Sequence, residues 1–179
     1  MVYVFLAQGF EEVEALSPVD VLRRCGVEVK TVGVGEKTVV SSHNVPVIAD
    51  ITDSEVTKEN LEAVILPGGM PGTLNLEKSA VVQEYIDYAV ENDLYVCAIC
   101  AAPSILGHKN LLNGRKATCF PGFEKDLYGA EATGDLAVAD GKFITGKGAG
   151  CTLNFALLIA EKLASKAVAD GVRESMQCP

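Results

Sequence analysis

The segment LYVCAICAAPSIL (94–106) decides the fold, because it passes from a buried strand directly into a helix. Its apolar first half is typical of an interior strand, and the small residues at the junction suit a tight turn. Such a turn lifts one side chain above the sheet, and Cys100 occupies that position. The segment therefore predicts an α/β protein with a candidate nucleophile at a strand end.

Short apolar runs alternate with helical patterns on both sides of this segment, and no linker or repeat interrupts them. Alternation of this kind predicts a mostly parallel central sheet with helices on both faces, and we expect residues 1–179 to form a single domain. Strands are predicted at 2–7, 27–34, 63–69, 94–100, 116–119, 133–138 and 142–145, with a short β excursion around 38–50. Helices are predicted at 11–24, 79–92, 101–108 and 150–163, the first with a kink or restart at Pro18 capped by Ser17.

Composition narrows the class of protein. A chain with 49% hydrophobic and 22% charged residues is globular, and a net charge of −9 argues against a nucleic-acid partner. No apolar run reaches membrane-spanning length. The start, MVYVFLAQGFEE, lacks the basic segment and cleavage site of a secretory signal, so the six cysteines indicate thiols in a reducing compartment. We expect a cytoplasmic protein.

Cys100 has a functional and a structural interpretation. Close to a helix N-terminus, its thiolate would be stabilised and its pKa lowered, but a buried cysteine can equally be a small core residue. Cys97 lies three residues earlier in the strand, which separates the pair by roughly 10 Å and turns the side chains to opposite faces. A disulfide between them is therefore not expected, and the remaining cysteines lack the paired spacing of a zinc site.

An acidic partner for this thiol is found in GFEEVEALSP (9–18). Glu11 and Glu12 suit the first turn of a helix, where negative charge is favourable. Glu14 stands between apolar residues and is expected to face the interior, where a carboxyl group has a raised pKa and can keep its proton. Neither His43 nor His108 is placed as a general base, so a Cys–His protease triad has little support.

Two glycine-rich segments could approach a ligand. PGGMPG (67–72) suits backbone N–H groups that form an oxyanion site, although an ordinary turn explains it equally well. GKGAGCT (146–152) has neither the dinucleotide-binding nor the Walker spacing, so no nucleotide cofactor is expected.

Four segments in order resemble the ThiJ/PfpI superfamily, and most closely the branch of the parkinsonism-associated protein deglycase and its bacterial relatives. They are FEEVEALSPVDVLRRCG, LPGGMPGTLNL, AICAAPSIL and GKGAGCTLNFALLIAEKL, and the resemblance runs from Met1 to about Leu163. It implies a flavodoxin-like three-layer sandwich that is usually a homodimer. It also implies that Cys100 is the reactive cysteine and Glu14 its protonated partner, with backbone amides from Gly68, Gly69 and Ala101, and it implies no metal or cofactor.

Two positions depart from the family pattern. Ala101 follows Cys100 where the protease-like branch carries histidine, so peptidase activity is not expected. Phe120 stands where animal members carry a histidine, which argues against a mechanism that uses that histidine, though bacterial members are similar to this sequence there. Cys119 beside it could supply a second thiol, and we interpret it as a filler residue.

The resemblance supports two functions. In the first, Cys100 adds to methylglyoxal, glyoxal or an early glycation adduct on a side chain, and Glu14 moves a proton so that hydrolysis releases a hydroxy acid such as lactate. In the second, a redox sensor or chaperone acts through oxidation of Cys100 to sulfinate, which Glu14 stabilises. Both need an accessible thiolate, so the sequence does not separate them.

Overall fold

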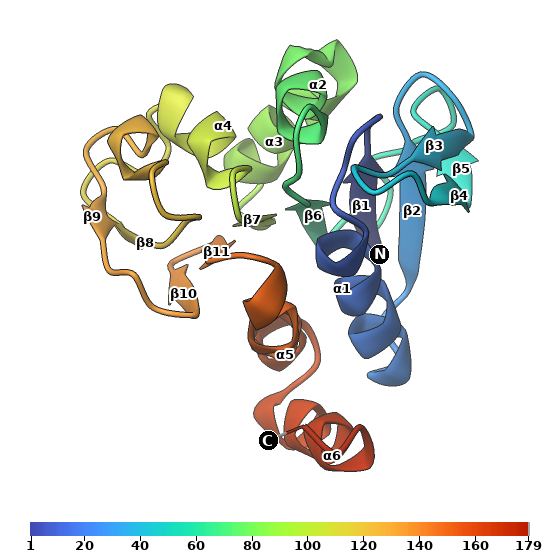
Figure 1. The fold of residues 1–179 in the computed structure, drawn as a ribbon. Helices are drawn as coiled ribbons and strands as arrows, with labels where there is room; N and C mark the ends of the chain where they lie inside the picture. Colours follow the sequence, from blue (N-terminus) through green and yellow to red (C-terminus); the bar gives the residue numbers. More distant parts are fainter. Residues whose placement is uncertain (179) are drawn as a thin grey trace.

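A seven-stranded sheet forms the centre of the computed structural model, which describes residues 1–178 (Figure 1). Its strand order is β10-β11-β7-β6-β1-β2-β5, and only β10 runs antiparallel to its neighbour. The strands are β1 Val2–Leu6, β2 Val29–Gly33, β5 Ile51–Thr52, β6 Ala63–Leu66, β7 Tyr95–Ile99, β10 Ala137–Asp140 and β11 Phe143–Gly146. Two small sheets pair β3 Thr38–Val40 with β4 Pro46–Ile48, and β8 Lys116–Ala117 with β9 Glu131–Ala132.

Helices cover both faces of this sheet and make three layers, as predicted (Figure 1). On one face lie α1 Glu12–Arg24 and α5 Thr152–Leu163, with α6 Lys166–Ser175 packed on α5. On the other lie α2 Gly72–Lys78, α3 Ala80–Glu91 and α4 Pro103–His108. Two short 3₁₀ turns, Glu124–Asp126 and Ala149–Cys151, complete the described elements. Among residues 1–178, no helix is both long and apolar enough to cross a bilayer.

Strand β1 shows how the two cores form. Successive side chains of a strand point to opposite faces, so Val4 and Leu6 join the core under α1 and α5, whereas Tyr3 and Phe5 join the core under α3. All four side chains are buried, which is the reason the strand reads as an unbroken apolar run.

The structure corrects several predicted elements. Helix α1 runs from Glu12 to Arg24 without a restart at Ser17, and Pro18 lies on its buried face. The helix is capped at its start instead, where the Glu11 side chain accepts a hydrogen bond from the Glu14 N–H. Helices α2 and α6 were not predicted. The strand expected at 133–138 is instead β10, which begins at Ala137 where it can pair with β11.

Candidate functional site

Cys100 lies in the tight turn that follows β7. Its backbone φ is 65°, a left-handed conformation that few residues other than glycine adopt. The Cys100 N–H donates to the Gly146 carbonyl at 2.9 Å, and the Phe120 N–H donates to the Cys100 carbonyl at 2.8 Å. Backbone hydrogen bonds from two neighbouring segments therefore hold the residue in this conformation.

Backbone amides surround the Cys100 sulfur. The N–H groups of Ala101 and Gly69 lie close to it and favour the thiolate, which lowers the pKa of Cys100. Helix α4 begins only at Pro103, three residues after the cysteine, so the sulfur does not sit at the helix N-terminus as the sequence suggested. Local amides rather than the helix dipole are the favourable electrostatic feature.

Glu14 reaches the same place from α1 and is completely buried, as predicted. The Gly68 N–H donates to its Oε2 at 2.9 Å, whereas Oε1 has no hydrogen-bond partner that meets normal distance and angle limits among the described residues. Because Oε2 acts as an acceptor, the proton of the neutral acid belongs on Oε1. Burial raises the pKa of Glu14 to about 7, and the Glu11 charge adds to this, while Cys100 and the Gly68 N–H act in the opposite direction.

Gly68 allows the two side chains to meet. A Cβ atom at this position would lie 2.7 Å from the Cys100 Cβ and 2.7 Å from Glu14 Oε2. Any side chain here would have to displace one of the two reactive groups. The N–H of Gly68 is already used by Glu14, so this glycine positions the carboxyl group, while Gly69 and Ala101 face the sulfur.

Cys100 and Glu14 titrate as a pair. Burial and the neighbouring Glu14 carboxylate raise the pKa of the Cys100 thiol to about 12, against the effect of the Ala101 and Gly69 amides. This is the opposite of the lowered pKa expected from sequence, because an acidic group and burial outweigh the amides. The two pKa values mean that the pair loses one proton near pH 7 and the second only in strongly alkaline solution. From neutral pH upward, the pair carries one negative charge, which the lower pKa places on Glu14.

The other thiols differ from Cys100 in environment. Cys97 is fully buried in β7, and burial raises its pKa. Cys119 is buried against the α3–α4 side of the core, where burial and the charges of Glu124 and Asp126 raise its pKa to about 11. All six cysteines are free.

The contact of His43 with the start of α1 was not predicted. It forms because the β3–β4 hairpin, which carries His43, folds back onto that end of the helix. Its Nδ1 lies 3.0 Å from Glu12 Oε2, and this hydrogen bond raises the pKa of His43. Ligand atoms of Glu11, Glu12 and His43 lie within 4.8 Å of one another, an arrangement able to accept a cation. Glu11 and Glu12 nevertheless act here as capping and ion-pairing groups at the start of α1.

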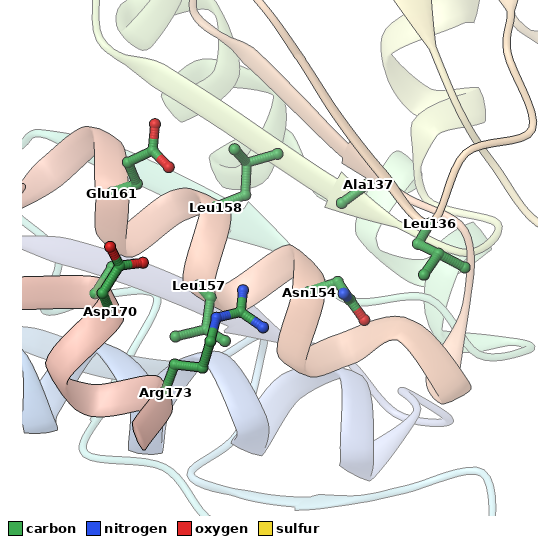
Figure 2. Close-up of a pocket in the computed structure, with 9 residues that line it drawn as sticks. Leu136, Ala137, Asn154, Leu157, Leu158, Glu161, Asp170 and Arg173 are labelled. Carbon is green, nitrogen blue, oxygen red and sulfur yellow. The ribbon is translucent and has the colours of Figure 1, made fainter. Parts of the chain in front are cut away.

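A cavity lies away from these residues, between α5, α6 and the start of β10 (Figure 2). It has a volume of about 250 Å³, and neither Cys100 nor Glu14 lines it. Its walls combine leucine side chains with a few charged groups and hold no nucleophile. The candidate catalytic groups therefore lie at the strand ends and not in this cavity. The cavity is lined by Leu136, Ala137, Asn154, Leu157, Leu158, Glu161, Ala169, Asp170 and Arg173.

Known proteins are similar to this chain in sequence and in fold. The profile of the DJ-1/PfpI family matches residues 1–162. Protein dj-1beta of Drosophila melanogaster is 34% identical over 91% of this chain and 89% of its own length. Protein DJ-1 homolog B of Arabidopsis thaliana is 33% identical over 92% of this chain, which spans only 38% of that longer protein.

Solved structures agree with the sequence comparison. A cysteine-to-alanine mutant of a DJ-1 superfamily protein from Salmonella typhimurium matches with a TM-score of 0.94 and 35% identity, over 99% of this chain and 98% of that one. Oxidized Toxoplasma gondii DJ-1 matches with a TM-score of 0.94 and 31% identity, over 98% and 97% of the two chains. The chain belongs to the DJ-1/PfpI family.

Proposed function

We propose that this protein detoxifies reactive aldehydes as a glutathione-independent glyoxalase or protein deglycase. The observation that supports this is the buried Oε1 of Glu14, which has no regular hydrogen-bond partner and faces the Cys100 site. A carboxyl group with a pKa near 7 beside a thiol can both accept and return a proton at neutral pH.

The proposed reaction begins with proton transfer from the Cys100 thiol to the Glu14 carboxylate. The thiolate then adds to the aldehyde carbon of methylglyoxal and a C–S bond forms. Glu14 passes the proton it has received to the aldehyde oxygen, which gives a hemithioacetal and restores the carboxylate. The N–H groups of Gly69 and Ala101 would stabilise the oxyanion that develops beside the sulfur.

Glu14 then completes the isomerisation. Its carboxylate removes the proton from the former aldehyde carbon, giving an enediolate, and returns that proton to the neighbouring carbon. The hydroxyl proton of the first carbon moves to the oxygen of the second, and a thioester of lactate results. Water cleaves the C–S bond, lactate leaves, and Cys100 recovers its proton. No external oxidant is needed, because one carbon is oxidised as its neighbour is reduced.

Peptidase chemistry is not proposed. His43 is hydrogen bonded to Glu12, and His108 to Glu77, so the two histidines of the chain have other partners. Ala101 is the buried residue that follows the cysteine and carries no proton-transfer group.

A steady-state assay with methylglyoxal in the absence of glutathione tests the proposal. We expect lactate formation by the wild-type protein. The absence of turnover in a folded, reduced sample would contradict it.

Redox sensing is the second candidate function. A sulfinate on Cys100 would accept hydrogen bonds from protonated Glu14 Oε1 and from the two amides, and a related solved protein is described as oxidized. Mass spectrometry after graded peroxide treatment tests it. Selective formation of Cys100 sulfinate in a protein without aldehyde turnover would favour this function over the enzyme.

We further propose that the protein is a homodimer in the cytoplasm. Exposed apolar side chains on α1 and on the β3–β4 hairpin support pairing: Val13 and Leu16 are 47% and 39% exposed, and Ile48 is 74% exposed. Six free thiols suit a reducing compartment. Sedimentation at micromolar concentration should show a dimer that Ile48→Lys weakens, and a persistent wild-type monomer would contradict the proposal.

A further inference from the structure

Three large apolar side chains stand partly exposed on segments that flank Cys100. Met70, Leu74 and Phe120 are 45%, 44% and 48% exposed. A single exposed apolar side chain is ordinary in a folded protein, so exposure alone means little. Here the three residues come from the two segments whose backbone contacts the reactive cysteine.

The first segment follows β6. Met70 comes directly after Gly69, whose N–H faces the Cys100 sulfur, and Leu74 lies one helical turn later in α2. The second segment follows β8. Its Phe120 N–H donates to the Cys100 carbonyl, and a Cβ on Gly148 would lie 3.3 Å from the Phe120 ring.

The two segments lie on opposite sides of the thiol. Strand β7, which leads into Cys100, is paired with β6 on one side and β11 on the other. Met70 and Leu74 belong to the β6 side, and Phe120, packed near the Gly148 turn after β11, belongs to the β11 side. The segments that carry these exposed apolar side chains therefore lie on both sides of the turn that holds Cys100.

Charge around this edge is negative. Glu11 and Glu12 follow β1, and Glu11 raises the pKa of Glu14. Lys147, which follows β11, donates to the Gly134 carbonyl. The His43 ring is hydrogen bonded to Glu12, so both of these cationic groups already have a partner. An aldehyde that carries a carboxylate would meet acidic groups here.

We propose that Met70, Leu74 and Phe120 form an apolar rim that selects uncharged α-oxoaldehydes with a large apolar or aromatic substituent. Such substrates are favoured over methylglyoxal, and anionic aldehydes such as glyoxylate are rejected. The inference rests on the proposed aldehyde chemistry of Cys100 and specifies its substrate class. One methylene group in an enclosed hydrophobic pocket changes kcat/KM by about 10- to 200-fold, and we expect a whole ring at a half-exposed rim to reach only the lower end of that range.

The test compares kcat/KM for phenylglyoxal, methylglyoxal and glyoxylate. We expect phenylglyoxal to exceed methylglyoxal by about tenfold, with glyoxylate the poorest. Phe120→Ala should remove most of that preference. Tyr128→Ala is the matched control, because Tyr128 is an aromatic residue of equal exposure, 49%, that stacks on His108 instead.

A second readout does not depend on turnover. The rate ratio of N-phenylmaleimide to N-methylmaleimide should be higher for Cys100 than for free cysteine, and Phe120→Ala should reduce this excess while Tyr128→Ala leaves it unchanged. If no aldehyde is turned over but the maleimide ratio behaves as expected, the proposed enzyme function fails and the rim stands. If wild type shows no preference for the larger reagent, or if both variants change the ratio equally, the rim is overturned. Slower reaction of the larger reagent would show that the rim excludes large groups, which also overturns it.

Discussion

Cys97 and Cys100 lie three residues apart and have opposite environments. Cys97 continues the regular strand and is sealed between the sheet and its covering helices. Cys100 has a left-handed backbone, partial exposure and a carboxyl group beside it. The backbone turn and the neighbouring carboxyl group therefore distinguish Cys100 from Cys97, not the type of residue.

The largest expected difference between these two cysteines is in catalysis. Cys100→Ala should reduce methylglyoxal turnover to background, because no other group forms the hemithioacetal. Cys97→Ala should retain most turnover and lower the free energy of unfolding by about 1 kcal/mol, through a small cavity in the core. Kinetics and urea denaturation of both variants measure this, and equal losses of turnover would remove the distinction.

Glu14→Gln isolates the contribution of the carboxyl group. The amide can still donate a hydrogen bond to Cys100 but cannot exchange a proton, so kcat for methylglyoxal should fall by about 10²-fold or more. Glu14→Asp withdraws the carboxyl by one methylene and should impair both properties. If instead only the sensitivity of Cys100 to peroxide changes, the redox function is favoured. If neither quantity changes, Glu14 is a structural residue.

Alkylation at different pH values compares the thiols directly. The Cys100 rate should rise about tenfold per pH unit up to about pH 7, where the pair loses its first proton, and then level off. Cys97 should react only after unfolding. Mass spectrometry of the labelled peptides measures both, and faster reaction of Cys25, Cys119 or Cys151 at pH 6 would show that the reactive thiol is misassigned.

The smallest expected effect is on stability. Burial raises the pKa of Glu14 from 4.5 to about 7, so between these values the folded protein binds more protons than the unfolded chain. The free energy of unfolding should therefore fall as pH rises, by about 2 kcal/mol between pH 5 and pH 7. Glu14→Gln should lack this slope. Urea denaturation at pH 5, 6 and 7 measures it, and parallel curves for the two proteins would contradict the raised pKa.

Much of the fold could be predicted because its signals are local. Apolar runs such as that of β1 and the helical pattern around Ala80–Glu91 reflect burial that each segment shows in its own sequence. Helix α2 was missed because PGGMPG resembles a turn, and α6 because its buried side consists of little more than Ala169 and Val172. The strand near 133–138 was misplaced because pairing with β11, not local preference, sets its start.

The site could be predicted only in part, because some of its features depend on residues that are far apart in the sequence. The interior position of Glu14 follows from its apolar neighbours in sequence. The pKa of Cys100 does not, because it depends on a carboxyl group 86 positions away and on the lack of a side chain at Gly68. The contact between His43 and Glu12 depends on how a hairpin folds back, which no local pattern in the sequence encodes.

The left-handed backbone of Cys100 has a consequence for evolution. Glycine adopts a φ of 65° without steric penalty, so Cys100→Gly is expected to fold into a protein at least as stable as Cys100→Ala. The backbone of this turn therefore does not require a cysteine, since the residue best suited to its conformation has no side chain at all. A thiol at this position is kept for its chemistry and not for the fold.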